Sequence, residues 1–462
     1  MVITKCWQCL MNLPSEFIAN VINVMLQLNK LGKDDPRRVI HSLKVSLAIT
    51  LVSTFYYFKP LYDSFGSSAM WAVITVIVVS EFSVGATLGK GLNRGFATFL
   101  AGVLGLGSYY IVQLISSGNT IMESILLGII IFLATAGVTY IRFLPKMKAR
   151  YDYGLLVFIL TYCLVCVSSF REHEIIDTAQ DRVTTILVGG LISVLVNILL
   201  CPVWAGCDLQ NLVSNNIEKL SKFLEGFGDE YFVTLEAGES NKSLMQGYKS
   251  VLNSKQVEDN LMNFARWEPC HGRFGYRHPW QQYQKIGNLS RQCAYRIDAL
   301  DGFLVNFTKT PKEIRSKIQE PCIQMSIETG KALKQLAISI HKMIPPIAAE
   351  THIATSKIYA TNLKAMIKTK LWKDTNLFEV VPVVTVASLL LDVVCSIEKL
   401  VESVQELSTL AKFKNKENNT AVEDQKEVPQ PCCNSSGPQH CQTHILEMST
   451  STIQKIQKPR EW

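Results

Sequence analysis

The pattern of apolar and polar positions divides the chain near residue 205. Before that point, six apolar segments alternate with short polar connections, at roughly 39–58, 67–80, 95–115, 124–140, 153–170 and 183–201. Several of them approach the ~20 residues that a helix needs to cross the hydrocarbon core of a bilayer. Asp35 can cap the first helix, and Pro36 suits its first turn. We therefore predict an all-α membrane protein with six transmembrane helices.

After residue 205 the pattern is typical of amphipathic helices. Residues 281–305 show it most clearly, with apolar side chains at steps of three or four: Tyr283, Ile286, Leu289, Cys293, Ile297, Leu300 and Leu304. Such a stripe packs against other helices. Thr310 and Glu313 predict a capping box around Pro311 at the start of the next helix. We expect a cytosolic helical bundle.

The domain boundaries follow from these patterns. We expect an N-terminal cytosolic segment at 1–38, a six-span domain at 39–201, a cytosolic helical domain at 202–412 and a disordered tail at 413–462. An apolar run at 377–394 could form a seventh span, but Glu379, Pro382 and Asp392 interrupt it. We favour a buried helix of the bundle there, because the apolar pattern continues beyond the run.

The basic residues indicate an orientation. The formal net charge is +7, and lysine and arginine gather beside the apolar segments, which favours a membrane and an anionic solute over nucleic acid as partners. Ten of them lie in connections of one side (Lys30, Lys33, Arg37, Arg38, Lys90, Arg94, Arg142, Lys146, Lys148 and Arg150), whereas only Lys59 and Arg171 lie in those of the other. The positive-inside rule then places both termini in the cytoplasm.

Four cations lie within or at the borders of the spans: Lys44, Lys90, Arg94 and Arg182. A lone basic residue near a helix end usually reaches back to the lipid headgroups. Four of them indicate more, because a charge at mid-bilayer costs at least ~2.5 kcal/mol and normally faces a bundle interior or a water-filled path. Lys90 and Arg94 share one helical face at spacing i, i+4, beside glycines that permit close packing. We interpret these cations as the lining of an anion path.

The opposite connections are acidic. Asp63 lies in one of them, and the other contains Glu172, Glu174, Asp177 and Asp181. Clustered carboxylates suit a hard multivalent cation, although a solvated loop would have the same composition. The segment from 267 to 280 contains Cys270, His271 and His278 without regular zinc spacing, and we interpret it as an ordered connector. The sequence predicts no enzyme and no cofactor, because no nucleophile–base pair, nucleotide loop or metal cluster emerges.

Three stretches resemble the plant aluminium-activated malate transporter family: DPRRVIHSLKVSLAITLVSTFYY at 35–57, SAMWAVITVIVVSEFSVGATLGKGLNRG at 68–95 and CPVWAGCDLQNL at 201–212. The resemblance continues through ARWEPCHGRFGYRHPW at 265–280. It implies a homodimeric channel for malate or other anions, with Lys44, Lys90, Arg94 and Arg182 in the conduction path. It also implies external aluminium sensing by acidic residues at the places of Asp63 and Asp177, with Glu172 beside them. His173 stands where responsive members have a carboxylate, which speaks against aluminium activation here.

Three functions compete at this stage. Passive anion permeation explains the intramembrane cations. A coupled organic-acid exporter, resembling aromatic-acid efflux proteins, would need a titrating group in the membrane, and His41 is the one histidine in a predicted span. A membrane-anchored scaffold leaves the cations unexplained. We expect the plasma membrane as the location, with the vacuolar membrane as the alternative.

Overall fold

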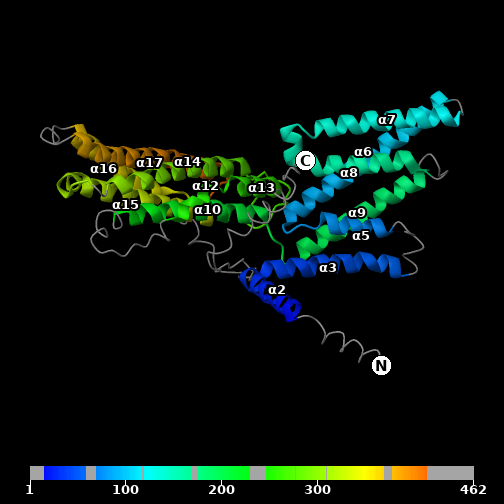
Figure 1. Ribbon diagram of the computed structural model, residues 1–462, viewed down its shortest axis with the longest axis horizontal. Coiled ribbons are helices and arrows are strands. Elements are labelled where there is room, and N and C mark those ends of the chain that lie inside the picture. The colour runs from blue at the N-terminus through cyan, green and yellow to red at the C-terminus, as the bar shows by residue number, and fades with distance from the viewer. Residues whose placement is uncertain are drawn as a thin grey trace, which may run out of the picture. The chain divides into compact units, whose positions relative to one another are not determined.

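The computed structural model describes residues 15–58, 69–116, 119–168, 175–228, 246–275, 277–307, 310–368 and 377–413 (Figure 1). Within these ranges the chain forms helices and no strand, apart from one isolated bridge between His271 and Phe274. The prediction of an all-α membrane protein is confirmed. The described helices form two compact units: a membrane unit that contains the chain up to Phe82 and Lys90–Pro202, and a C-terminal unit that contains Ser83–Gly89 and the described residues between Val203 and Phe413.

The membrane unit begins with the amphipathic helix α2 (Ser15–Asp34). Six further helices match the six predicted apolar segments: α3 (Pro36–Tyr57), α5 (Ala69–Val79), α6 (Val84–Ser116), α7 (Thr120–Ile141), α8 (Pro145–Ser168) and α9 (Ile175–Leu199). Four of the six, α3, α6, α7 and α8, are long and apolar enough to cross a membrane; the apolar parts of α5 and α9 are shorter. The cap of α3 is as predicted, because the Asp35 side chain accepts a hydrogen bond from the Arg37 amide at 3.1 Å.

Two small cores hold the membrane helices together. Ala48 and Val52 of α3 pack with Ala72 and Val76 of α5 and with Val196 of α9. A second core joins α6, α7 and α8 through Ala97, Ala101, Val112, Leu127, Val157, Phe158, Tyr162 and Cys166. Large apolar side chains of α7 point outward, with Ile121, Phe132 and Tyr140 each at least 70% exposed. Outward apolar faces are typical of helices in contact with lipid or a partner subunit.

Helix α6 begins earlier than the apolar pattern predicts. The apolar run starts near residue 95, but the helix starts at Val84, so the glycines at 85, 89 and 91 lie inside it. Lys90 and Arg94 are consequently within the helix and not at its amino terminus. The amides of the first turn belong to Val84–Thr87, so the amino terminus of α6 does not lie beside these two cations.

The C-terminal unit is a bundle of long helices. Its elements are α10 (Ala205–Gly228), η4 (Gln246–Tyr248), α12 (Lys249–Leu252), α13 (Lys255–Ala265), α14 (Trp280–Phe307), α15 (Lys312–Lys342), α16 (Ile347–Lys368) and α17 (Leu377–Leu410). The predicted stripe of α14 is buried in one continuous core, with Leu289 partly buried at its edge. α17 contributes Val383, Leu390 and Ile397 to the same core, as a bundle helix at 377–394 would, and from Glu379 to Leu410 it is also long and apolar enough to cross a membrane.

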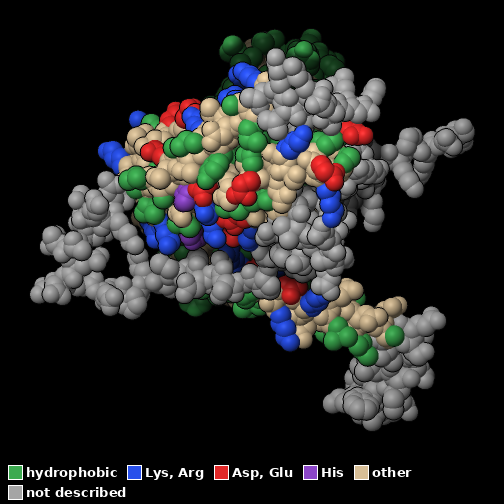
Figure 2. Space-filling view, turned by 90° about the vertical axis from the view of Figure 1, so that its left-hand side faces the viewer, with side chains coloured by type: hydrophobic (Ala, Val, Ile, Leu, Met, Phe, Trp, Pro, Cys, Tyr) green, Lys and Arg blue, Asp and Glu red, His purple; other side chains and the backbone are tan. Residues whose placement is uncertain are grey.

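Two local features of this unit differ from or extend the predictions. α15 starts at Lys312 with Pro311 as the capping residue and without a side-chain cap, so the capping box of Thr310 and Glu313 is wrong. Lys, Arg, Asp and Glu side chains are interspersed on the face shown in Figure 2, as is typical of a surface in contact with water.

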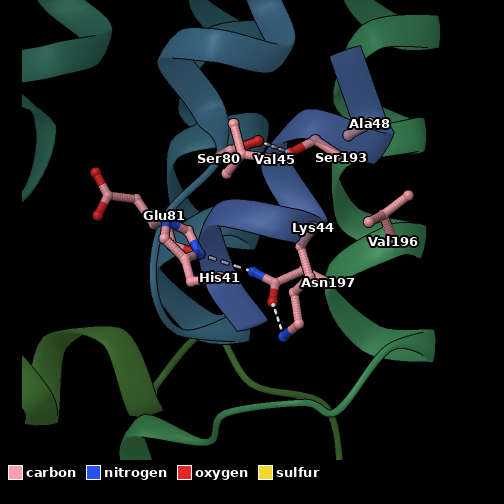
Figure 3. Close-up of a pocket in the computed structure, with 9 residues that line it drawn as sticks. All are labelled: His41, Lys44, Val45, Ala48, Ser80, Glu81, Ser193, Val196 and Asn197. Carbon is pink, nitrogen blue, oxygen red and sulfur yellow. Dashed lines mark hydrogen bonds between the residues drawn. The ribbon is translucent and has the colours of Figure 1, made fainter. Parts of the chain in front are cut away.

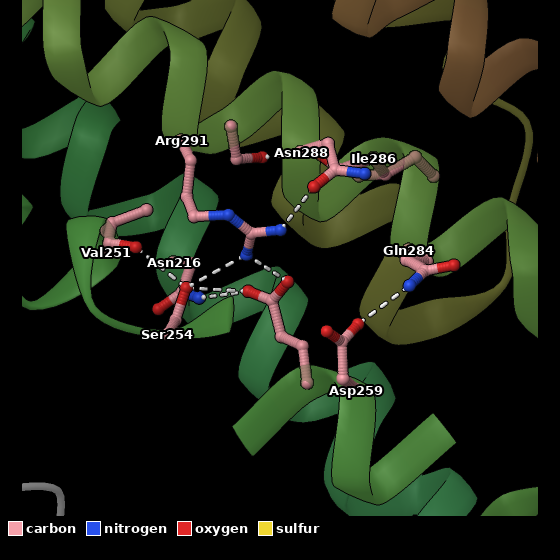
Figure 4. A network of polar contacts seen from close by, with 10 residues as sticks. Asn216, Val251, Ser254, Asp259, Gln284, Ile286, Asn288 and Arg291 are labelled. Atoms are coloured by element: carbon pink, nitrogen blue, oxygen red, sulfur yellow. Dashed lines mark hydrogen bonds and ion pairs between the residues drawn. The ribbon is translucent and has the colours of Figure 1, made fainter. Parts of the chain in front are cut away.

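A buried polar network crosses the bundle (Figure 4). The Glu258 carboxylate of α13, 2% exposed, pairs with Arg291 of α14. It also accepts hydrogen bonds from Ser254 at 2.7 Å and from Asn216 of α10 at 3.1 Å. Charges removed from water are tolerated only when they are paired and hydrogen-bonded. The network therefore fixes the mutual register of α10, α13 and α14.

Candidate functional site

Lys44 of α3 is buried between helices, with 4% of the residue exposed. Its Nζ donates to the Asn197 Oδ1 of α9 at 3.1 Å and to the backbone carbonyl of Cys201 at 2.9 Å. Cys201 follows the end of α9, where backbone carbonyls lack helical partners and the helix dipole is negative. An ammonium group has three donors, so these two bonds leave one for another acceptor.

A small pocket adjoins the Lys44 ammonium (Figure 3). Its walls come from α3, α9 and the segment after α5, and they include His41, Ser80, Glu81 and Ser193. Ser80 and Ser193 are joined by a hydrogen bond of 2.8 Å across the pocket wall. The cavity volume is about 10 Å³, which is roughly the space of one water molecule.

Lys90 and Arg94 converge on Tyr153 of α8. The Lys90 ammonium lies 5.8 Å from the centre of the Tyr153 ring, and Arg94 Nη1 donates to the Tyr153 hydroxyl at 3.0 Å. The shared helical face that the sequence predicts for the two cations is therefore confirmed. Lys90 also forms an ion pair with the Glu81 carboxylate.

Arg94 is the least compensated of these cations. Only 5% of the residue is exposed, and its Nε has no hydrogen-bond partner within the described part of the chain. A buried N–H without an acceptor costs about 1–3 kcal/mol. Such a donor is a natural contact for an anion or water that enters the site.

Lys44, Lys90 and Arg94 belong to one continuous series of polar contacts, here called the polar string. It also contains Asn197, Glu81 and Tyr153. Asn197 accepts a hydrogen bond from Lys44 and donates one through Nδ2 to the Glu81 carbonyl at 3.0 Å. The Glu81 carboxylate forms an ion pair with Lys90. Lys90 and Arg94 both contact Tyr153. Three cations and one carboxylate give this string a formal charge of +2. The sequence reasoning missed Asn197 and Tyr153, although a lone amide in the apolar run of α9 is itself a signal of a polar contact within the membrane.

The remaining predicted site residues are less fully placed. Arg182 and Asp177 lie on α9, whose side chains at these positions fall outside the described part. Asp63 and Glu172 also lie outside the described residues, as does the predicted tail from 414 onward. In the described ranges, no group of three or more His, Cys, Asp or Glu side chains could hold a metal ion.

Comparison with known proteins identifies the family. A family model described as "Aluminium activated malate transporter" matches residues 29–372. The chain belongs to this family. "Aluminum-activated malate transporter 2" of Arabidopsis thaliana is 49% identical over 401 residues, which cover 86% of this chain and 79% of that relative. "Aluminum-activated malate transporter 1" of Triticum aestivum is 42% identical over 402 residues, with 85% of this chain and 86% of the relative covered.

The family assignment settles the general class of activity. Members of the aluminium-activated malate transporter family are transporters, so the chain is a membrane transporter and not an enzyme. The resemblance seen in the three sequence motifs is confirmed. Two of those motifs contain Lys44, Lys90 and Arg94, the cations of the polar string.

Proposed function

We propose that the protein is a channel that passes malate and other anions through the membrane domain at residues 39–201. The observation that carries this proposal is Arg94, a buried guanidinium with a donor that no described protein group satisfies. Buried basic groups lower the energy of an anion in a low-dielectric passage. An anion would lose part of its hydration to Arg94, Lys90 and Lys44 and leave down its electrochemical gradient.

Weak binding at each step is what conduction requires. Lys90 is already paired with Glu81, and Lys44 has one donor left after its two protein contacts. Neither cation would therefore hold an anion as a fully free charge does. The formal charge of +2 over the string attracts anions, while the protein partners keep each site shallow. Arg182, one turn or more into α9, is the fourth proposed lining residue.

The pocket beside Lys44 is too small for a dicarboxylate, because about 10 Å³ holds one water molecule. We infer that the conducting path widens when two copies of the chain assemble, as a homodimer with the path along the polar string. The lysine and arginine count supports a topology with both termini in the cytoplasm, and we propose residues 202–412 as the cytosolic domain. We place the protein in the plasma membrane, with the vacuolar membrane as the alternative.

The role of aluminium is a separate part of the proposal. The family name of the relatives refers to activation by this ion. His173 occupies the place of an expected carboxylate between Asp63 and Asp177, so the external side offers one negative charge fewer to a trivalent ion. We therefore expect currents that external aluminium does not increase. The comparison of currents before and after its addition tests this expectation.

Charge reversal at Arg94 tests the proposed path. Arg94→Glu places a carboxylate beside Tyr153 and lowers the charge of the string from +2 to zero. We expect malate current in voltage-clamped cells to be abolished or its anion selectivity inverted. Lys146→Glu, the same charge change at an exposed position at the start of α8, is the control and should retain selectivity. Unchanged selectivity in Arg94→Glu, with normal surface abundance, would contradict the path.

A coupled organic-acid exporter is the second candidate. One observation favours it: two titratable side chains, His41 and Glu81, line the same pocket as Lys44. The His41 Nδ1 is buried and has no hydrogen-bond partner among the described residues, so it could receive a proton. A coupled cycle would make transport depend on the proton gradient. Reversal potentials that follow the anion gradient alone would exclude this candidate.

A further inference from the structure

The segment Trp267–Pro269, which the proposed conduction mechanism does not use, contains a buried carboxylate at the junction of two helix starts. The Glu268 side chain is 1% exposed. Its Oε1 accepts from the Ala205 amide at 2.5 Å and its Oε2 from the Gly206 amide at 3.0 Å, both at the start of α10. The Gly85 amide, in the first turn of α6, donates to the same carboxylate. One side chain thus caps two helices that are far apart in the sequence.

The packing around Glu268 requires glycine at three positions. A Cβ on Gly85 would overlap the Phe264 carbonyl, and one on Gly206 would overlap the Trp280 ring. A Cβ on Gly89, one turn further along α6, would lie 2.9 Å from Cδ1 of Trp267. The Val84 amide also donates to the Val203 carbonyl at 2.9 Å. The first two turns of α6 are therefore seated closely on the segment that contains Glu268, within the C-terminal unit.

Helix α6 is continuous from Val84 to Ser116. Its first turns belong to the C-terminal unit, and the turns that carry Lys90 and Arg94 belong to the membrane unit. Because a helix transmits displacement along its hydrogen-bonded backbone, a shift of its capped turn reaches Lys90 and Arg94 within one to three turns. The carboxylate that holds this turn is thus placed to act on the proposed anion path.

His271 lies against the same carboxylate. Its Nδ1 lies 2.9 Å from the Pro269 carbonyl, and since a carbonyl only accepts, that nitrogen carries the proton of the neutral ring. Its Nε2 is buried without a described hydrogen-bond partner, 3.8 Å from Glu268 Oε2. The ring is held there by stacking on Trp204, with centroids 3.7 Å apart. The unprotonated His271 Nε2 and the ionised Glu268 Oε2 are both acceptors, so their lone pairs repel each other. A single proton between these two atoms would remove that repulsion.

We propose that Glu268 is a positioning residue for the anion path, and that the proton it shares with His271 sets how firmly it holds the first turn of α6 against α10. The inference rests on the proposed channel function. In the ionised state, both carboxylate oxygens accept from the helix amides. When a proton from cytosolic water binds at Oε2, that oxygen becomes a donor to His271 Nε2, and its bond with the Gly206 amide weakens. The contacts of the Glu268 carboxylate with the amides of Gly85, Ala205 and Gly206, here called the clasp, then weaken, and the first turn of α6 is held less firmly.

The titration properties of the surroundings place this event in the physiological range. Burial raises the pKa of Glu268 to about 7, against the opposing effect of the three backbone amides, and Asp208 of α10 raises it further. Burial also lowers the pKa of His271, so its ring stays neutral near pH 7. His278, whose pKa burial lowers to about 4, is neutral as well. The segment Ser83–Gly89, which contains the first turns of α6, contributes no titratable side chain.

Malate currents in inside-out patches from cells that express the full chain, with the cytosolic face stepped from about pH 8 to about pH 6, test the proposal. We expect the wild-type current to change roughly fivefold or more, the lower range of coupling between two sites, with a midpoint near pH 7. Glu268→Gln has one acceptor oxygen fewer, as the protonated acid has, and should fix the current at its low-pH level. His271→Phe keeps the stack on Trp204 and should move the midpoint to lower pH.

His352→Phe is the matched control, because His352 forms the other described histidine–glutamate pair of this unit, with Glu328 at 2.8 Å. Its pH profile should equal that of the wild type. A wild-type current that does not change with pH, or wild-type profiles in both clasp variants, would overturn the proposal. If Glu268→Gln does not reach the membrane, the profile of His271→Phe decides alone.

Hydrogen exchange of the purified chain separates this proposal from the channel function. The amides at 84–87 and 205–207 should lose protection, relative to intrinsic rates, as the pH falls through 7 in the wild type but not in His271→Phe, whose loss begins at lower pH. A chain that shows this change but conducts no anion would contradict the channel and retain the clasp. A chain that conducts malate with unchanged protection would contradict the clasp and retain the channel.

Discussion

Because Glu81 forms an ion pair with Lys90, we predict that removal of the Glu81 negative charge increases anion transport. Glu81 is the one carboxylate in the polar string, and its side chain is 34% exposed. Glu81→Gln keeps the size of the side chain but frees Lys90, so the formal charge of the string rises from +2 to +3. Since exposed ion pairs contribute little to stability, the variant should fold normally.

The size of the effect follows from Coulomb's law with screening. A divalent anion about 7 Å from the freed ammonium gains roughly 1.2 kcal/mol in water before screening. At about 0.1 M ionic strength the Debye length of about 10 Å halves this gain to about 0.6 kcal/mol, which is an increase of about threefold in local anion occupancy. At about 0.01 M the gain is about 0.9 kcal/mol, or about fivefold.

Single-channel conductance for malate at the two ionic strengths is the appropriate measurement. We expect Glu81→Gln to exceed the wild type at both, with the larger ratio at low salt. The double variant Glu81→Gln, Lys90→Gln restores a charge of +2 and should return to near the wild-type conductance. A conductance of Glu81→Gln that equals or falls below the wild type, in protein of normal abundance, would refute the assignment of Lys90 to the anion path.

Three further predictions concern the packing of both units. Lys44→Met leaves the two acceptors of its ammonium group without a donor, so it should lower the free energy of unfolding in detergent by about 1–3 kcal/mol and also reduce malate current. Arg291→Met leaves the buried Glu258 carboxylate without its ion-pair partner and should lower the free energy of unfolding by about 3–5 kcal/mol, seen as a lower thermal midpoint. Lys285→Met removes one partner of an exposed ion pair and should leave the thermal midpoint unchanged. Burial lowers the pKa of His278 to about 4, so its imidazole binds a proton at a higher pH in the unfolded chain than in the folded one. The free energy of unfolding should therefore fall as the pH drops from about 6.5 towards 4, and it should fall less in His278→Phe.

Local sequence patterns predict the helices well where one physical signal dominates. Asp35 and Pro36 mark the start of α3, and the α14 stripe from Tyr283 to Leu304 is buried as its period of three to four residues requires. The capping box expected at Thr310 does not form, because the N-cap of α15 is Pro311, whose side chain has no oxygen to accept from the helix amides. The start of α6 was also missed, since glycines at 85 and 89 weaken helix propensity while tertiary packing favours a helix.

The candidate site was only half accessible to sequence reasoning. The spacing of Lys90 and Arg94 predicts a shared face, and both side chains do meet Tyr153. The partners of Lys44 could not be foreseen, because Asn197 and Cys201 lie more than 150 residues away along the chain. The same reason hides the contact of Glu268 with α6. Long-range contacts of this kind depend on how the helices pack, which local periodicity does not encode.

The reversal potential of the wild-type current tests the central claim most directly. With malate as the main permeant ion, a passive anion path predicts a shift of about 29 mV for each tenfold change in the malate gradient, as expected for a divalent ion. The shift should be the same with and without a proton gradient. A reversal potential that follows the proton gradient, or that ignores malate, would contradict the account.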